Sequence, residues 1–161
     1  MRLTAFSDLA LRLLMHLAQR HDELCTIADV AEEHGVSESH LMKVTHLLAQ
    51  GGIVETLRGR GGGMRLARPA AAITLGEVVR LTESDFALVE CFSGQSACKL
   101  DGQCGLAGTL DEALAAFLAV LDRRTLADVA GTSASGRPVA PITLVRRTVG
   151  ARTGAARRSA S

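Results

Sequence analysis

The chain has 161 residues, of which 47% are hydrophobic, and it contains four Phe but no Trp or Tyr. This length suits one domain, or a small domain with an added dimerisation element, and the core must be built from aliphatic side chains, which favour helices. No run of eighteen apolar residues occurs, and charges interrupt the apolar stretch at the N-terminus. We therefore expect no membrane span and no secretory signal, and we expect a cytoplasmic protein that keeps its four cysteines reduced.

Charge is distributed unevenly along the chain. The formal net charge is +1, yet residues 131–161 hold six Arg and no Asp or Glu, while the other 130 residues hold 12 basic and 17 acidic side chains. Because the body is acidic, any contact with nucleic acid has to come from local basic patches. The tail 131–161 is rich in Ser, Thr, Gly, Ala and Arg, a composition typical of disorder.

The first predicted element is a helix over residues 7–20. Leucines recur there at the spacing of one helical face, which indicates a helix with a buried side. Ser7 or Asp8 is the expected N-cap, because short polar side chains accept a hydrogen bond from the first free backbone N–H groups.

A helix-turn-helix follows. Thr26 predicts the start of a helix over 27–34, and Ser37 predicts the start of another over 38–50. The turn between them is only three residues long and contains a glycine. A helix, a short glycine-containing turn and a capped helix together form the helix-turn-helix pattern.

The next segment predicts a β-hairpin. Residues 53–57 and 64–67 have the composition of strands, and the loop 58–63 between them is rich in Gly and Arg. A hairpin directly after a helix-turn-helix is a wing. We therefore predict a mainly α protein whose residues 1–68 form a winged helix-turn-helix DNA-binding region.

Candidate DNA contacts lie on the second helix of this motif and at the tip of the wing. Short polar groups at the start of such a helix reach base edges in the major groove, and a lysine reaches a phosphate. Arginines of a wing insert into a narrow minor groove. The alternative for each residue is an ordinary solvated surface. The predicted contacts are Ser37, Glu38, Ser39, His40, Lys43, Arg58 and Arg60.

A second region, 69–130, is expected to hold a helix, a cysteine loop and a long C-terminal dimerisation helix. Helices are predicted over 74–83 and 109–124, each capped by its first residue, a threonine, and a short helix over 125–130 follows. The segment 109–124 is apolar nearly all round and so has to be covered on more than one face. In a chain this small, a second copy is the simplest cover.

Three of the four cysteines lie within fourteen residues of one polar loop, at Cys91, Cys98 and Cys104. Zinc-binding cysteines usually stand two to four residues apart, and here six and five residues intervene. The wider spacing favours an iron–sulfur cluster over zinc or incidental thiols. Cys25 stands apart and is expected to be a small buried hydrophobe.

A cubane cluster needs a fourth ligand, which the loop does not supply as a cysteine. A carboxylate in that place would bind more weakly than a thiolate and leave one iron exchangeable, which suits a sensor better than an electron carrier. The five histidines are also candidates, although each fits a polar helix surface. The carboxylate candidates are Glu90, Asp101 and, at longer range, Asp8.

Residues 1–130 resemble the iron–sulfur winged-helix repressors of the IscR/NsrR type. IscR-like members carry a His three residues after the third cysteine, where this chain has Ala107, so the resemblance is closest to the nitric-oxide-sensing members of the family. The motifs that carry it are the opening MRLTAFSDLALR, the wing GRGGG, the three-cysteine loop and the closing DRRTLADV.

The resemblance implies a homodimer that binds a palindromic double-stranded operator. It implies that Cys91, Cys98 and Cys104 hold the cluster, 4Fe-4S being favoured and 2Fe-2S the alternative, and that Asp8 of the partner subunit is the oxygen ligand. The implied function is a repressor that leaves DNA when nitric oxide attacks the cluster.

Other functions stay open at this point. Within the family, the effector could be iron supply or redox state instead of nitric oxide. Outside the family, the chain could be a small iron–sulfur electron carrier or a zinc-stabilised interaction module. No enzyme is expected, because no Ser/His/Asp or paired-carboxylate set stands in a catalytic context.

Overall fold

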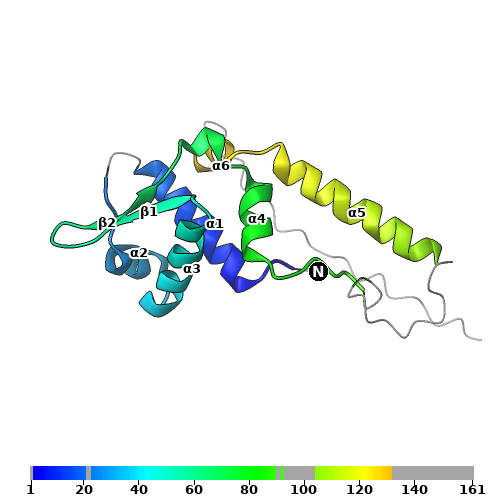
Figure 1. The fold of residues 1–161 in the computed structure, drawn as a ribbon, viewed down its shortest axis with the longest axis horizontal. Helices are drawn as coiled ribbons and strands as arrows, with labels where there is room; N and C mark the ends of the chain where they lie inside the picture. The colour runs from blue at the N-terminus through cyan, green and yellow to red at the C-terminus, as the bar shows by residue number, and fades with distance from the viewer. Residues whose placement is uncertain (1, 21–22, 90–91, 93–103, 132–161) are drawn as a thin grey trace, which may run out of the picture.

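The computed structural model describes residues 2–20, 23–89, 92 and 104–131. The winged-helix part lies at one end, and one long helix, α5, extends away from it (Figure 1). The elements in chain order are α1 (Ala5–Gln19), α2 (Ile27–His34), α3 (Glu38–Gln50), β1 (Val54–Leu57), β2 (Gly63–Leu66), the 3₁₀ turn η1 (Ala70–Ala72), α4 (Leu75–Thr82), α5 (Gly105–Asp122) and α6 (Leu126–Ala130).

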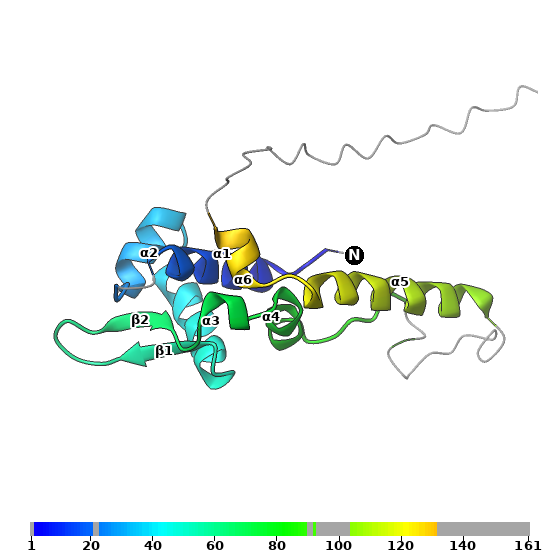
Figure 2. The same cartoon turned by 90° about the horizontal axis from the view of Figure 1, so that it is seen from above.

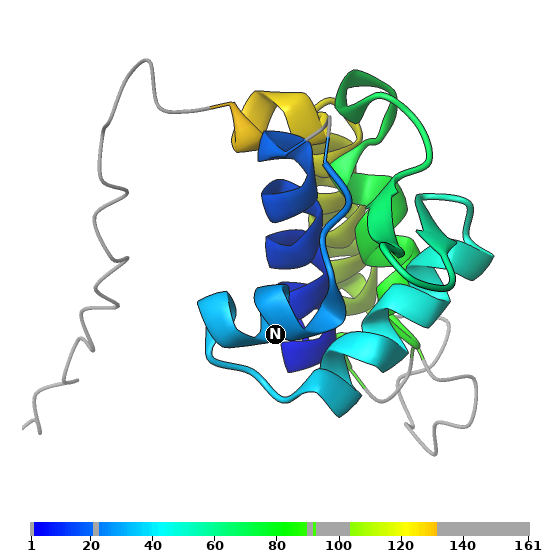
Figure 3. The same ribbon diagram turned by 90° about the vertical axis from the view of Figure 1, so that its left-hand side faces the viewer.

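Helix α1 is the centre of the core. It packs against α3, α4, α6 and β2, and Figure 3 shows it in blue beside α3 in cyan. Its leucines recur on one face, so Leu13 and Leu14 are completely buried and Leu17 nearly so. The same cluster takes in Leu41, Val44 and Leu48 of α3, Ile53, Met64, Ile73, Val78 and Leu126.

The helix-turn-helix and wing are confirmed. The Thr26 hydroxyl accepts from the Asp29 N–H at 3.2 Å and the Ser37 hydroxyl from the His40 N–H at 3.4 Å, so both predicted caps are used. Gly35 ends α2 at φ 63°, a left-handed conformation that suits glycine. The strands β1 and β2 form an antiparallel hairpin in which Val54 pairs with Leu66.

The predicted N-cap of the first helix is wrong. Helix α1 begins at Ala5, and the Thr4 hydroxyl accepts from the Ser7 N–H at 3.2 Å, so Ser7 and Asp8 both lie inside the first turn. A contact from far along the chain fixes this start. The Glu83 carboxylate accepts from the Thr4 N–H at 2.8 Å and from the Ser7 hydroxyl at 2.5 Å.

The predicted start of the long helix is also wrong. Helix α5 begins at Gly105 with Cys104 as its N-cap, and Thr109 lies one turn inside, where its hydroxyl donates to the Gly105 carbonyl at 3.0 Å. Two glycines in its first turn argue against a helix on propensity alone. The Thr109 hydroxyl satisfies a carbonyl of its own helix instead of capping one.

Helix α5 is attached to the rest of the chain at its C-terminal end. Arg80 of α4 forms a two-pronged ion pair with Asp122, at 2.5 and 2.7 Å, and Gly76 lies directly beneath that carboxylate. No side chain of α5 is buried within the single chain, and Figure 2 shows the helix projecting past α4. None of the described helices combines the length and apolar character needed to cross a bilayer.

A histidine pair joins the C-terminal ends of α1 and α2. The buried His16 ring contacts the His34 ring edge-on, with 5.3 Å between the two ring centroids. The His16 Nδ1 lies 3.4 Å from a Glu33 carboxylate oxygen. Burial lowers the pKa of His16, and the nearby charge of Arg20 lowers it further, which together outweigh the opposing effect of Glu33.

We expect this histidine to make stability depend on pH. The folded state favours neutral His16, whereas an unfolded histidine takes up a proton near its ordinary pKa of about 6.5. The unfolded state therefore binds more protons, and the free energy of unfolding should fall as pH drops below about 6.5 towards the lowered folded pKa. Urea unfolding between pH 7.5 and 5.5 measures this slope, which His16→Gln should reduce. The exposed His40→Gln should keep it, and an unchanged slope in His16→Gln would contradict the assignment.

Candidate nucleic-acid interface and cysteine segment

The outer face of α3 is exposed. Its inner positions Leu41, Val44 and Leu48 are completely buried in the core, which fixes the rotation of the helix. The predicted contact residues Glu38, Ser39, His40 and Lys43 are therefore solvent-exposed. Ser37 is exposed as well, and its hydroxyl caps the helix. These five predicted residues lie together at the N-terminal half of one helix.

The wing presents two arginines at its tip. Arg58 and Arg60 are both exposed, and they alternate with Gly59 at φ 101° and Gly61 at φ 78°, two left-handed positions that glycine adopts without strain. The tip is closed by the Gly62 N–H, which donates to the Gly59 carbonyl at 3.0 Å. At the base of the wing, Arg65 pairs with Glu55 across the two strands, so positive charge concentrates at the tip.

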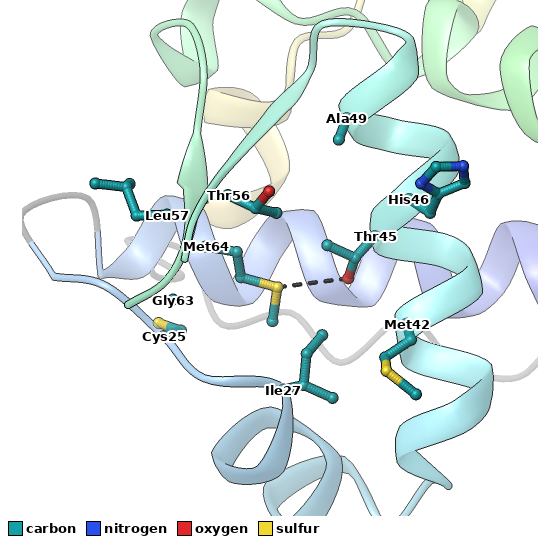
Figure 4. Close-up of a pocket in the computed structure, with 10 residues that line it drawn as sticks. All are labelled: Cys25, Ile27, Met42, Thr45, His46, Ala49, Thr56, Leu57, Gly63 and Met64. Carbon is teal, nitrogen blue, oxygen red and sulfur yellow. Dashed lines mark hydrogen bonds between the residues drawn. The ribbon is translucent and has the colours of Figure 1, made fainter. Parts of the chain in front are cut away.

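A groove of about 350 Å³ separates α3 from the wing (Figure 4). The Thr45 hydroxyl donates to the Met64 sulfur at 3.4 Å across its floor. Most of the lining is apolar, and sequence reasoning missed it because its residues come from four separate stretches of the chain. The lining residues are Cys25, Ile27, Met42, Thr45, His46, Ala49, Thr56, Leu57, Gly63 and Met64.

The prediction that Cys25 is a small buried residue is confirmed. Burial raises the pKa of the Cys25 thiol. The backbone of Cys25 is bridged to that of Met64: the Cys25 N–H donates to the Met64 carbonyl at 3.0 Å, and the Met64 N–H donates to the Cys25 carbonyl at 2.8 Å. Cys104 is partly exposed at the start of α5, where its side chain makes no capping hydrogen bond. Cys91 and Cys98, and also Glu90 and Asp101, lie outside the described residues, as does the tail 132–161.

Within the described ranges, no group of three or more His, Cys, Asp or Glu side chains could hold a metal ion. Of the three predicted cysteine ligands, Cys104 is the one that the described residues include, and its chemistry fits an iron–sulfur cluster. Cys104 is partly exposed and stands at a helix N-terminus, whose backbone dipoles favour a negative charge. Thiolate is the usual ligand of iron–sulfur centres.

Asp8 lies in the first turn of α1 with its side chain 67% exposed, and its carboxylate is 3.7 Å from Arg12. Arg12 in turn lies 3.4 Å from both the His34 ring nitrogen and the His34 carbonyl at the end of α2. The first turn of α1 is thus linked to the helix-turn-helix through a single side chain.

Glu83 is a residue that sequence reasoning missed. Burial raises the pKa of its carboxyl, but hydrogen bonds from Ser7 and Thr4 outweigh this and hold the pKa below its usual value. Ser7 also lies 2.7 Å from the Thr82 hydroxyl. The chain that leads into the cysteine segment is therefore fastened to the start of α1. No local signal marks this contact, since its partners lie more than seventy residues apart.

A helix-turn-helix with a capped and exposed α3, followed by an arginine-tipped hairpin, defines a winged helix-turn-helix DNA-binding protein. The family model Rrf2, an iron-dependent transcriptional regulator, matches residues 3–132. The chain belongs to the Rrf2 family and is a transcription regulator and not an enzyme. A transcription regulator is not an electron carrier, so this membership removes that alternative.

Curated relatives support the assignment. The HTH-type transcriptional regulator NsrR of Bacillus subtilis is 50% identical over 131 residues, which cover 80% of this chain and 90% of that protein. The protein aau3 of Rhizobium meliloti is 46% identical over 130 residues, which cover 80% of this chain and 84% of that protein. The predicted resemblance to the IscR/NsrR type is therefore confirmed.

Solved structures support the fold. IscR of T. potens superposes with a TM-score of 0.65 at 25% identity and covers 80% of this chain and 85% of its own. The oxidized form of CymR from Staphylococcus aureus superposes with a TM-score of 0.66 over 81% of this chain and 97% of its own, and at 23% identity it supports the fold alone.

Proposed function

We propose that this chain is a homodimeric repressor that holds an iron–sulfur cluster and leaves its operator when nitric oxide reacts with that cluster. The observation that carries the proposal is the 50% identity to a regulator named NsrR. The three-cysteine loop and Ala107 point to the same nitric-oxide-sensing branch of the family.

Cys91, Cys98 and Cys104 would hold the cluster, together with Asp8 of the partner subunit. When bound, the cluster would supply iron to which nitric oxide can bind. Two observations favour Asp8: Thr4 already caps α1, so Asp8 is not needed as a cap, and its carboxylate is exposed. Arg12 contacts both Asp8 and the end of α2. A change in the position of Asp8 could therefore be transmitted through this one side chain to the helix-turn-helix that contains α3.

The dimer would form through α5. The helix has no buried side chain within one chain, and it exposes Leu106 (63%) and Val120 (50%). Uncovered apolar residues on a helix this long call for a partner, and a second copy supplies a matching face. Two copies would present two α3 helices and two wings to the halves of a palindromic operator.

An anaerobic titration with nitric oxide tests the proposal. Visible absorbance and binding to an operator fragment are followed in the same samples. The cluster absorbance and the DNA complex should disappear together. Persistent DNA binding after the absorbance is lost would contradict nitric oxide as the effector. A colourless protein from anaerobic cells would contradict the cluster itself.

The supply of iron is a second candidate effector, because the family is described as an iron-dependent transcriptional regulator. In that case an iron chelator should release the DNA under anaerobic conditions without nitric oxide. Parallel titrations with the chelator and with nitric oxide separate the two effectors.

The wing arginine Arg60 should contribute to DNA binding through charge. Arg60→Ala should weaken binding and reduce the slope of log affinity against log salt by about one, because one phosphate contact is lost. Arg60→Lys is the matched control and should keep the slope. Fragment binding measured across a salt series, with absorbance as a check of the cluster, gives both numbers. An unchanged slope in Arg60→Ala would contradict a phosphate contact at this residue.

A further inference from the structure

One large apolar side chain interrupts the polar face of α3. Met42 is 54% exposed, although the core positions of this helix are already filled by Leu41, Val44 and Leu48. Ser39 stands three residues before Met42 and His46 four residues after it, so all three lie on one side of the helix. Met42 therefore belongs to the outer surface of α3 and not to the core.

Met42 also forms one rim of the groove between α3 and the wing. The opposite rim carries Leu57, which is 45% exposed at the end of β1, and Figure 4 shows the two side chains on either side of the groove. The two rims are the exposed apolar part of a surface whose other exposed side chains on α3 are polar or charged.

The charges around this rim favour DNA as the occupant. Lys43 follows Met42 directly, and Arg58 follows Leu57 directly; both are exposed. The one acid of the described α3, Glu38, is also exposed and lies four residues before Met42, on the same side of the helix. A surface that places an apolar side chain between cations suits a polyanion carrying small apolar groups.

The major groove of DNA offers one such group, the C5-methyl of thymine. A methionine suits it because the unbranched thioether adapts its shape to a small apolar partner. We propose that Met42 determines operator specificity by contacting the C5-methyl group of a thymine in each half-site. The inference rests on the proposed DNA-binding role of α3. The methyl group of 5-methylcytosine has the same chemistry, so the test has to separate the two bases.

Deoxyuridine provides the test, since it pairs as thymine does but lacks the methyl group. The cluster-loaded protein is used to select a tight-binding fragment from a random-sequence pool, and each thymine of that fragment is then replaced by deoxyuridine in turn. At one position in each half-site, the replacement should weaken binding about fourfold, the effect of one buried methyl group. Absence of any sensitive position would overturn the proposal. Failure to select any fragment would count against the proposed function instead.

Three variants assign the sensitivity to Met42. Met42→Gln keeps the length of the side chain and should bind the thymine and deoxyuridine fragments equally, whereas Met42→Leu should keep the difference. Leu57→Ala, on the opposite rim, is the matched control and should also keep it. A full deoxyuridine effect in Met42→Gln would overturn the proposal. If deoxyuridine has no effect and binding tightens only when the cytosines are methylated, then Met42 contacts 5-methylcytosine. This result would overturn the proposed contact with thymine.

Discussion

Cys104→Ala should yield a colourless protein that stays dimeric and no longer binds the operator. On the proposed function, the chain has three thiolate ligands, and the fourth ligand is a weaker carboxylate. Removal of one thiolate leaves too few strong ligands to retain the cluster. Iron content, visible absorbance and fragment binding are measured on the same anaerobic sample, and the oligomeric state is measured by sedimentation. The same result is expected for Cys98→Ala.

Two controls separate the ligand from the helix. Cys104 is the N-cap of α5, and Ser is a good N-cap, so Cys104→Ser should preserve the start of the helix while removing the thiolate. It should be as colourless as the alanine variant. Cys25→Ala, which changes a buried cysteine, should remain coloured. Full operator affinity in a colourless Cys104→Ser protein would show that the cluster does not control DNA binding.

Leu13→Ala should lower the free energy of unfolding by about 2–5 kcal/mol, because it removes a large side chain and leaves a cavity. Leu13 is completely buried on α1, the helix that packs against α3, α4, α6 and β2. Small domains are stable by only about 5–15 kcal/mol, so this loss threatens folding at growth temperature.

Urea unfolding of the iron-free protein measures the loss without a contribution from the cluster. Leu57→Ala is the control, because its side chain is 45% exposed and should change stability by no more than about 0.5 kcal/mol. A loss below about 1 kcal/mol for Leu13→Ala would contradict the central place of α1 in the core.

Local signals in the sequence predicted the helices well. Thr26, Ser37 and Thr74 each accept a hydrogen bond from the backbone N–H of the residue three positions on, so the whole interaction lies within four residues of sequence. The exposure of the outer face of α3 could be predicted because buried positions recur every three to four residues along a helix. The arginines at the wing tip could be predicted because they stand in a glycine-rich turn.

Contacts between distant segments could not be predicted. The start of α1 depends on Glu83, 79 residues after Thr4, and no local pattern links the two. The start of α5 could not be predicted for a different reason: the helix begins at Gly105, although two glycines in its first turn argue against a helix. Met42 was overlooked because the sequence assigned the leucines of that helix to the core and its polar residues to the surface, and its groove is completed by the wing.

The attachment of α5 at one end gives the helix the properties of a lever. Its 18 residues span about 27 Å between Cys104 and the Arg80–Asp122 ion pair. A tilt of about 10° about the anchored end moves the far end by about 5 Å, more than the 3.4 Å between successive base pairs. If two copies pair through α5 as proposed, a tilt of this size would change the angle between each DNA-binding region and the helix that joins it to its partner.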